Sequence, residues 1–515
     1  MPVSSPPPRP WTALRCARVA ALVFLVLGAA LPVQAGPEGG RWGGPWRVEQ
    51  ADPGSVDRDH TALEWVLIYT LGGVIALVLV YTGRHYVFTL SRLFERQRHA
   101  YALVDEAPWP SLTVIVPAHN EEAVIGSSLE ALLAADYPPD RLTIVPLDDR
   151  STDRTAAIIG AYALDNDRVQ PFYRTGGRPG KAAALRDATE RVTSDVVLVF
   201  DADYVPGPDL LKRLAAPFAD PEVGAVMGRV VPLNTDRNLL TRLLDLERTG
   251  GYQVDQQARQ NLGLVPQYGG TVGGVRRAAL AAVGGWNEGA LAEDTDATCR
   301  LLVGGWKVAY VNRAECYEES PETWPVRIRQ IRRWARGHTN VAGRMLVPLL
   351  RARHLSLRER VDGALLLGVY LMSPVVMVGW VVATALFYLG AHPLHGFVAA
   401  LAVASYNTLG NFAAFFEIAT GARLDGSPHR VRLLPLNLLG FVVSLVATSR
   451  AVISEVLPGE RFRWDKTERF REDAPTAPPP RPARLSKRPA APPPRRPAPH
   501  AERPAASASA PTTAR

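Results

Sequence analysis

The sequence predicts an α/β domain with a mostly parallel, doubly wound sheet, flanked by transmembrane helices. Between residues 111 and 320, four apolar, β-branched runs alternate with helical stretches, a pattern typical of parallel sheets covered by helices. On both sides of this region, long apolar stretches match the length that a helix needs to span a bilayer. The four runs are Leu112–Val116, Leu142–Leu147, Val196–Phe200 and Val223–Val231.

Composition excludes several classes of protein. With 47% hydrophobic and 21% charged residues, the 515-residue chain is not a wholly disordered protein. Its three cysteines are too few for a disulfide scaffold and form no Cys-x-x-Cys pair, so we expect the domain to fold in a reducing compartment. The net charge of +8 suggests nucleic acid binding, but residues 474–515 contain eight Lys and Arg and a single acid, Glu502. The surplus therefore describes the tail, and we expect no nucleic acid partner.

The N-terminal residues predict a targeting segment followed by a membrane helix. In residues 1–35, three arginines precede a 13-residue apolar stretch and a small-residue cleavage site, which indicates a cleaved signal peptide or, alternatively, a short uncleaved anchor. Residues 36–60 are expected to form an extracytoplasmic linker, and 61–83 a transmembrane helix. The basic residues of 84–110 place this linker, and the domain 111–320 after it, in the cytoplasm of a bacterial plasma membrane enzyme.

After the α/β domain the chain returns to the membrane. Residues 321–360 predict interfacial helices, and 361–457 about three apolar segments, the candidates being Val361–Gly390, Phe397–Thr420 and Leu433–Val456. The third contains Arg450 and Glu455, so we expect its second half to be interfacial or packed in protein. Residues 458–515 predict a basic, disordered tail rich in Pro, Ala and Arg, which is a solvated linker or a contact for lipid or a protein partner.

Acidic residues follow two of the predicted strands. Asp148 and Asp149 end the second run, and Asp201 and Asp203 follow the third with one small residue between them. Ligands bind beyond the carboxyl ends of parallel strands, and two carboxylates there suit Mg²⁺ or Mn²⁺ holding a diphosphate. The alternative for Asp201 and Asp203 is a capping turn before two prolines; Asp153 is a candidate N-cap of the next helix.

Three further groups carry candidate chemistry. Glu293 and Asp294 start a predicted helix, where acids either complement the helix dipole or supply a general base. Lys181 lies where a glycine-rich loop meets a helix and suits a phosphate contact, although the loop lacks the P-loop spacing. Helical spacing places an amide, a guanidinium and an indole on one face, which suits a sugar and a phosphate; these are Gln330, Arg333 and Trp334.

Together and in this order, the motifs resemble family-2 glycosyltransferases, the membrane-embedded inverting enzymes. That family includes cellulose, chitin, hyaluronan and poly-N-acetylglucosamine synthases, and some bacterial glucosyldiacylglycerol synthases share its core. The resemblance covers about residues 108–345 and includes the stretch from Gly269 to Glu288 that runs into Asp294. It implies a nucleotide-diphospho-sugar transferase domain with a GT-A-like fold. The sequence departs from the family at Ala292, where Thr is usual, and at Arg150, where Gly is frequent.

The resemblance also implies a role for each motif. Asp294, beside Glu293, would be the catalytic base, and Asp201 and Asp203 would hold the Mg²⁺ or Mn²⁺. The predicted helix face with the amide, guanidinium and indole would hold the acceptor sugar and steady the leaving UDP; its residues are Gln330, Arg333 and Trp334. The nucleotide-sugar would contact Pro117, Asn120, Glu121, Asp148, Asp149, Lys181 and Asp201.

Three functions follow as hypotheses. The leading one is transfer of a hexose from a UDP-sugar to a growing β-linked polysaccharide, with the later apolar segments guiding the chain outward. The second is a single transfer to a lipid acceptor such as diacylglycerol. The third, a catalytically silent membrane scaffold or export partner, is disfavoured because every acidic motif position is intact.

Overall fold

The computed structural model describes residues 60–101, 107, 109–390 and 412–456, all of which belong to one compact unit. The predicted signal peptide, nearly all of the predicted extracytoplasmic linker, and the predicted tail lie outside these residues. So does most of the predicted second apolar segment of the C-terminal region.

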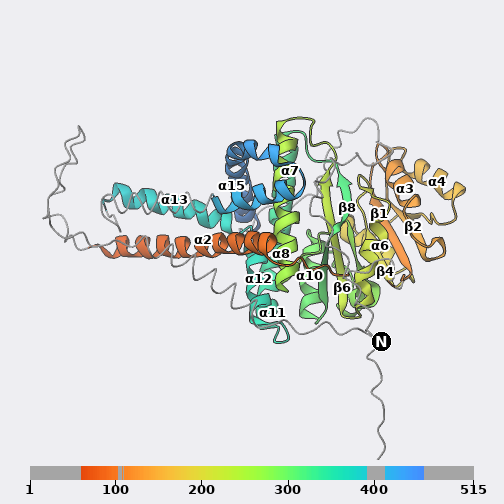
Figure 1. Cartoon of the computed structure of the whole chain (residues 1–515), viewed down its shortest axis with the longest axis horizontal. Coiled ribbons are helices and arrows are strands. Elements are labelled where there is room, and N and C mark those ends of the chain that lie inside the picture. Colours follow the sequence, from red (N-terminus) through yellow and green to blue (C-terminus); the bar gives the residue numbers. More distant parts are fainter. Residues whose placement is uncertain (1–59, 102–106, 108, 391–411, 457–515) are drawn as a thin grey trace, which may run out of the picture. The chain divides into compact units, whose positions relative to one another are not determined.

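One eight-stranded sheet forms the centre of the α/β domain (Figure 1). Its strands are β1 (Leu112–Ala118), β2 (Leu142–Asp149), β3 (Phe172–Arg174), β4 (Val196–Val199), β5 (Val205–Pro206), β6 (Val223–Pro232), β7 (Gly273–Arg276) and β8 (Lys307–Glu318). They lie in the order β3-β2-β1-β4-β7-β6-β8-β5. Pairing is parallel among β1, β2, β3 and β4 and between β6 and β8, whereas β7 runs antiparallel to both neighbours and β5 antiparallel to β8. The sheet is therefore mixed and mostly parallel.

The four apolar runs of the sequence are β1, β2, β4 and β6, so these predictions are confirmed. The whole of β4 is buried, which explains its uninterrupted valine and leucine run, because strands covered on both faces need no polar alternation. Three of the strands that the sequence analysis missed are only two to four residues long. The fourth, β8, has twelve residues but contains Asn312 and Arg313 in its middle, which breaks the apolar pattern.

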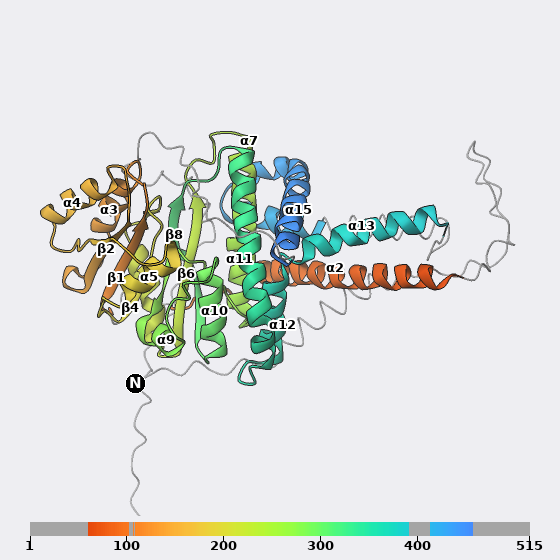
Figure 2. The same ribbon diagram turned by 180° about the vertical axis from the view of Figure 1, so that it is seen from behind.

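Helices pack around this sheet and continue the chain toward the membrane segments (Figures 1 and 2). The α-helices and the π-helix η5 of the domain are α3 (Ile125–Leu133), α4 (Thr155–Asp165), α5 (Lys181–Thr189), α6 (Leu210–Ala215), α7 (Leu239–Thr249), η5 (Gly250–Gln256), α8 (Gln257–Leu262), α9 (Arg277–Ala282) and α10 (Glu293–Val303). Short 3₁₀ turns are η3 (Pro139–Arg141) and η4 (Ala216–Ala219). Among the packing contacts, α5 lies against β1 and β2, and α6 against β6 and β8.

Within the described residues, two helices are long and apolar enough to cross a membrane. The first, α2 (Ala62–Phe94), begins at a capping box in which Thr61 and Glu64 satisfy each other's backbone N–H groups. This pairing accounts for the acid near the start of an apolar helix. The helix continues eleven residues past the predicted end at 83, so its basic inner part belongs to the same rigid element.

The predicted segment Val361–Gly390 lies in a pair of helices joined at a bend. The pair consists of α12 (Leu357–Gly368) and α13 (Met372–Tyr388), bent by 71°. Pro374 lies in the first turn of α13, just after the break. It has no N–H to donate to the Tyr370 carbonyl, and its ring crowds that carbonyl, which favours a bend here. Counting the pair as one, the described residues contain up to three candidate spans.

The last described helix packs against the long helix that follows the α/β domain. Residues 412–424 are helical, and after the 3₁₀ turn η6 (Pro428–Leu433) the chain forms α15 (Leu434–Val456). This helix lies against α11 (Trp324–Arg351), where Asn340 Nδ2 donates to Glu455 Oε1 at 3.1 Å (Figure 2). The acid in the second half of this apolar segment is thus packed in protein, as expected.

Candidate functional site

One cavity of about 1360 Å³ collects most of the predicted site residues. Its first end, here called the donor end, is formed by the loops after β1, β2 and β4. Its second end, here called the membrane end, is formed by side chains of α2, η5, α11 and α12. Eleven of the thirteen predicted residues line it: Pro117, Glu121, Asp149, Lys181, Asp201, Asp203, Glu293, Asp294, Gln330, Arg333 and Trp334.

The two other predicted residues, Asn120 and Asp148, are not among the lining residues. Instead, both form hydrogen bonds to the turn after β2, at the donor end. The Asn120 side chain accepts from the backbone N–H of Thr152 at 2.7 Å, and its own backbone N–H donates to the Ser151 hydroxyl at 2.9 Å. Asp148 is buried, and its carboxylate accepts from the Ser151 N–H at 3.4 Å. Asn120 therefore holds the loop after β2 against the loop after β1, whereas Asp148 stabilises the turn after β2 from within.

The turn after β2 shows how the chain accommodates Arg150 at a position where the resemblance leads us to expect glycine. Its φ of +62° lies in the left-handed region, where glycine is the usual residue because it has no Cβ. Arg150 adopts this conformation and donates from Nε to Asp149 Oδ1 at 2.9 Å. The loop keeps its shape without the glycine, at the cost of some backbone strain.

A residue that the sequence analysis missed, Arg174, fixes the Asp149 carboxylate. The short strand β3 pairs with β2 so that Arg174 lies opposite Asp149. Its side chain, only 2% exposed, donates to Asp149 Oδ1 and to Asp187 Oδ2, both at 2.8 Å. A three-residue strand leaves no period to recognise, so the pattern of apolar residues could not have predicted this contact.

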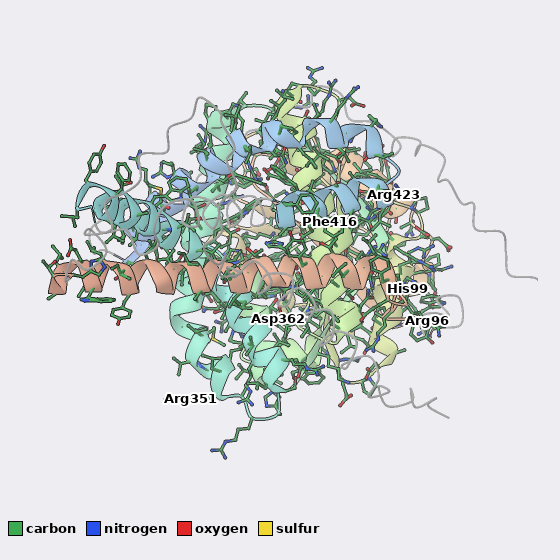
Figure 3. All side chains as sticks on the ribbon, turned by 60° about the vertical axis from the view of Figure 1, so that its left-hand side comes forward. Arg96, His99, Arg351, Asp362, Phe416 and Arg423 are labelled. Carbon is green, nitrogen blue, oxygen red and sulfur yellow. The ribbon has the colours of Figure 1, made fainter. Side chains whose placement is uncertain are left out.

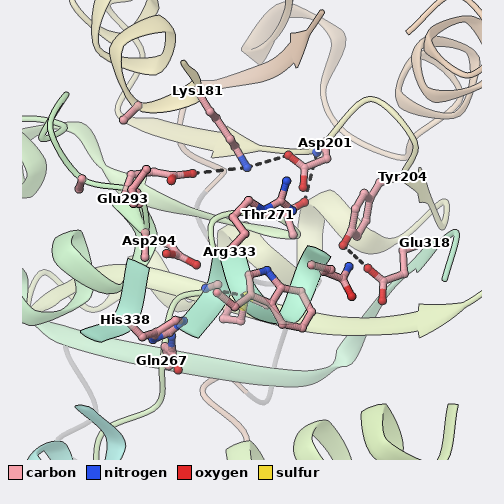
Figure 4. A pocket seen from close by; sticks show the side chains of 18 of the residues that line it. Lys181, Asp201, Tyr204, Gln267, Thr271, Glu293, Asp294, Glu318, Arg333 and His338 are labelled. Atoms are coloured by element: carbon pink, nitrogen blue, oxygen red, sulfur yellow. Dashed lines mark hydrogen bonds and ion pairs between the residues drawn. The ribbon is translucent and has the colours of Figure 1, made fainter. Parts of the chain in front are cut away.

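Lys181 links the two acidic pairs of the cavity (Figure 4). Its ammonium, at the start of α5, donates to Asp201 Oδ1 at 2.7 Å and to the Gly270 carbonyl at 3.0 Å, and lies 3.6 Å from Glu293 Oε1. Burial opposes the charge, but the Asp201 and Glu293 carboxylates outweigh it and raise the pKa of Lys181. The lysine is therefore a fixed positive charge between the acids, in the position of a phosphate contact.

Asp201 and Asp203 follow β4 and suit a divalent cation that takes its other ligands from a diphosphate and water. Both carboxylates line the cavity, and the side chain of Asp203 is 3% exposed. Among the described residues, no group of three or more His, Cys, Asp and Glu side chains is arranged to hold a metal ion. Two carboxylates supply hard oxygens but leave most of an octahedral shell open, which suits Mg²⁺ or Mn²⁺ when diphosphate oxygens and water complete it.

Glu293 and Asp294 form the first turn of α10, as predicted, and they point into a buried part of the cavity. Burial raises the pKa of Glu293 to about 7, and it also raises the pKa of Asp294, against the Thr295 N–H that donates to Asp294 Oδ1 at 2.7 Å. The turn at Gly270, with φ of +71°, makes room for Asp294, because a Cβ at Gly270 would lie 2.9 Å from the Asp294 Cβ. Carboxylates with raised pKa are suited to accept a proton near neutral pH.

The predicted face of α11 borders the cavity beside these acids. The Trp334 ring lies 5.4 Å from the guanidinium carbons of both Arg248 and Arg327, within the range of cation–π contacts. Arg327 also donates to Gln330 Oε1 at 2.8 Å, so the amide and the indole share one support.

The acid Glu318, which the sequence did not single out, connects Arg248, next to Trp334 of α11, with Tyr204 in the loop that carries Asp201 and Asp203. It accepts from the Tyr204 hydroxyl at 2.6 Å, next to Asp203, and lies 2.6 Å from Arg248 Nη2. Glu318 ends β8, so the rule of inspecting strand ends would have found it if that strand had been recognised.

The membrane end of the cavity was not predicted from the sequence. Arg84 on α2 donates to Asp255 of η5 at 2.5 Å and lies 3.7 Å from Asp362 of α12, and Arg259 contacts both acids. Tyr81 donates to the Leu365 carbonyl at 2.8 Å. Figure 3 shows Asp362 and Phe416 on either side of α2. Buried ion pairs thus join α2, η5, α8 and α12 into one wall of the cavity.

Comparison with known proteins agrees with this geometry. Residues 110–337 match the family model described as "Glycosyltransferase like family 2". The chain is 28% identical over 378 residues to a probable glycosyltransferase, YdaM, of Bacillus subtilis, covering 70% of this chain and 88% of the relative. It is 37% identical over 231 residues to a beta-monoglucosyldiacylglycerol synthase of Synechocystis, covering 45% of this chain and 48% of the relative, so it spans about half the length of that protein.

A solved structure supports the fold. The mannosyltransferase PcManGT of Pyrobaculum calidifontis, in complex with GDP-Man and Mn²⁺, superposes with a TM-score of 0.52 at 20% identity, over 77% of this chain and 100% of that one. Residues 110–337 are therefore a glycosyltransferase family 2 domain with a GT-A-like fold.

Proposed function

We propose that this glycosyltransferase moves a hexose from a UDP-sugar to an acceptor hydroxyl in one displacement that inverts an α-linked donor to a β-linked product. The observation that carries the proposal is the meeting, in one cavity, of the Asp201 and Asp203 pair, Lys181, the Glu293 and Asp294 pair, and the α11 face. A donor end rich in hydrogen-bonding groups and a second end at the membrane helices suit a soluble nucleotide-sugar and a membrane-derived acceptor.

In this mechanism Asp294 takes the proton of the acceptor hydroxyl while its oxygen forms a bond to the anomeric carbon. The bond from that carbon to the β-phosphate oxygen breaks, and UDP leaves with the bonding electrons. Lys181 and Arg333 would neutralise charge that grows on the leaving diphosphate, where preorganised cations are most effective. A divalent cation held by Asp201 and Asp203 would add Lewis acid stabilisation of the same charge.

For the acceptor, we propose a membrane lipid, which reverses the order of the two hypotheses drawn from the sequence. The membrane end of the cavity includes Tyr81, Leu366, Val369 and Tyr370, from α2 and the α12–α13 break. An acceptor with apolar chains would reach Asp294 from this side with its hydroxyl leading. The synthase of Synechocystis, whose name states a glucolipid product, supports the same choice.

A growing β-linked polysaccharide is the second candidate, and a specific observation favours it. The Trp334 indole, supported by Arg248 and Arg327, resembles a platform on which a sugar ring would stack. Sugar-polymerising and lipid-glycosylating enzymes would differ in what passes the membrane end, not in the donor end.

The topology of the proposal is multi-pass, with the catalytic domain in the cytoplasm of a bacterial plasma membrane. The basic residues Arg84, Arg92, Arg96 and Arg98 follow the apolar part of α2. Exposed Arg423 lies at the end of the helical residues 412–424, and exposed Arg432 lies in η6, before α15. Such an excess of arginine marks cytoplasmic loops.

The test is a product assay with the full-length protein in lipid nanodiscs, Mg²⁺ or Mn²⁺, diacylglycerol and radiolabelled UDP-glucose or UDP-N-acetylglucosamine. We expect a chloroform-soluble monoglycosyl lipid that a β-glycosidase cleaves, and loss of activity with EDTA that is restored by the cation. A large, alkali-stable polymer would instead support the second candidate. Absence of UDP release with either donor, under every cation and acceptor condition, would contradict the proposal.

A further inference from the structure

One residue in the cavity, His338, belongs to none of the motifs. It lies on α11 one turn after Trp334, and positions four apart on a helix share a face, so it lines the same cavity. No other described histidine lies in the cavity beside the acids of α10; His85 and His119, the other lining histidines, contact Glu417 and the Asp149 carbonyl.

His338 is connected to Asp294 through Thr295. Figure 4 shows the His338 and Asp294 side chains near each other in the cavity. Its Nδ1 lies 3.3 Å from the Thr295 hydroxyl oxygen, which also accepts from the Gln267 amide at 2.9 Å. The backbone N–H of the same threonine donates to Asp294 Oδ1 at 2.7 Å. One residue, Thr295, therefore fixes the position of the imidazole relative to the carboxylate.

The imidazole is neutral at physiological pH. Burial lowers the pKa of His338 to about 4. The ring also packs against Tyr370, with centroids 4.7 Å apart, which restricts its rotation. A neutral imidazole has one donor and one acceptor nitrogen. The Thr295 hydroxyl lies within hydrogen-bond distance of both Asp294 Oδ1, at 3.4 Å, and His338 Nδ1, at 3.3 Å. In the tautomer whose Nδ1 accepts a hydrogen bond, Nε2 carries the N–H donor.

We propose that His338 is an acceptor-binding residue whose Nε2–H donates to the acceptor hydroxyl oxygen and thereby directs the proton of that hydroxyl toward Asp294. This assignment rests on the proposed function. The ligand class is an alcohol, either a lipid hydroxyl or a sugar hydroxyl. No proton is transferred to or from His338; the proton of the acceptor passes to Asp294, and His338 fixes the direction of the oxygen lone pairs.

The experiment compares two substitutions of similar volume, His338→Gln and His338→Leu, in the full-length protein with labelled UDP-sugar and diacylglycerol. Glutamine keeps an N–H donor, whereas leucine keeps only packing against Tyr370. We expect His338→Leu to lower kcat/KM for the acceptor about tenfold, the size of one lost hydrogen bond, and His338→Gln to remain within about threefold of the wild type. The UDP dissociation constant and the slow hydrolysis of donor without acceptor should change in neither.

The matched control is His354→Gln, because this histidine contacts the Leu302 carbonyl at 2.8 Å outside the cavity. It should leave the acceptor kinetics unchanged. Equal acceptor kinetics in the glutamine and leucine variants, whether both are normal or both impaired, would overturn the hydrogen-bond assignment. If His338→Leu does not fold, judged by thermal unfolding and UDP binding, the pair His338→Asn and His338→Ala replaces it. Wild-type protein that transfers no sugar would refute the proposed function, and not this inference separately.

Discussion

The two ends of the cavity are built in different ways. At the donor end, each functional group directly follows a strand or begins a helix within a few residues of it, as Asp149, Asp201 and Lys181 do. At the membrane end, Arg84, Asp255 and Asp362 come from three helices far apart in the sequence and meet only through buried ion pairs. The difference teaches that local motifs specify the groups to which the proposed function assigns donor binding, whereas long-range helix packing shapes the path proposed for the acceptor.

The largest effect on activity is expected where the two ends meet, because Asp294→Asn should abolish most of the sugar transfer. Asparagine cannot accept the acceptor proton, so we expect kcat to fall about 10³-fold, the usual size of general-base catalysis. The UDP dissociation constant and the acceptor KM should stay near their wild-type values. Radiolabelled product formation and calorimetry with UDP measure these quantities. Unchanged sugar transfer in this variant would show that Asp294 is not the base.

At the donor end, Arg174→Ala should weaken donor binding alone. It removes the charged hydrogen bonds to Asp149 and Asp187, so we expect the donor KM to rise about 30-fold, with the acceptor KM unchanged. The control is Arg213→Ala, an arginine of α6 outside the lining of the cavity whose partner Asp209 is at the surface. Equal donor KM values for the two variants would show that the Asp149 carboxylate does not contribute to nucleotide binding.

With a saccharide acceptor, the second candidate above, Trp334→Ala should raise the acceptor KM about tenfold, since the sugar ring would lose the indole on which it stacks. The donor KM should not move. The matched control, Trp324→Ala, lies on the same helix but outside the lining of the cavity. A selective effect on the donor would contradict the division of the cavity into two ends.

The smallest effect concerns pH. The raised pKa values of Glu293, about 7, and of Asp294 mean that the pair holds a proton at low pH, which blocks the base. Activity should therefore rise with pH through an apparent pKa near 7 that belongs to the pair, by about tenfold between pH 6 and pH 8. An initial-rate profile at saturating donor measures it, and Glu293→Gln should shift the midpoint downward because it removes one negative neighbour. A rate independent of pH over this range would contradict the raised pKa.

Much of the α/β domain could be predicted because its strands are buried on both faces. Such strands read as uninterrupted runs, so β1, β2, β4 and β6 were recognisable, and the strand-end rule led directly to Asp201 and Asp203. The strand β8 was not recognisable because Asn312 and Arg313 interrupt it, and with it Glu318 was missed. Arg174 escaped for a different reason, since its partner Asp149 lies 25 residues away and only strand pairing brings them together.

By itself, the sequence determined the class of chemistry: short motifs with fixed spacing place carboxylates, a lysine and an aromatic face where strands end and helices begin. Only the tertiary structure decided how those groups meet. It placed Lys181 between the two acidic pairs, bent the segment just before Pro374, and set His338 beside the proposed base through Thr295. The physical reason is the separation along the chain between the residues that must meet. Strand ends and helix starts follow from neighbours along the chain, whereas ion pairs and cavity walls depend on contacts across hundreds of residues, for which a single sequence carries no period.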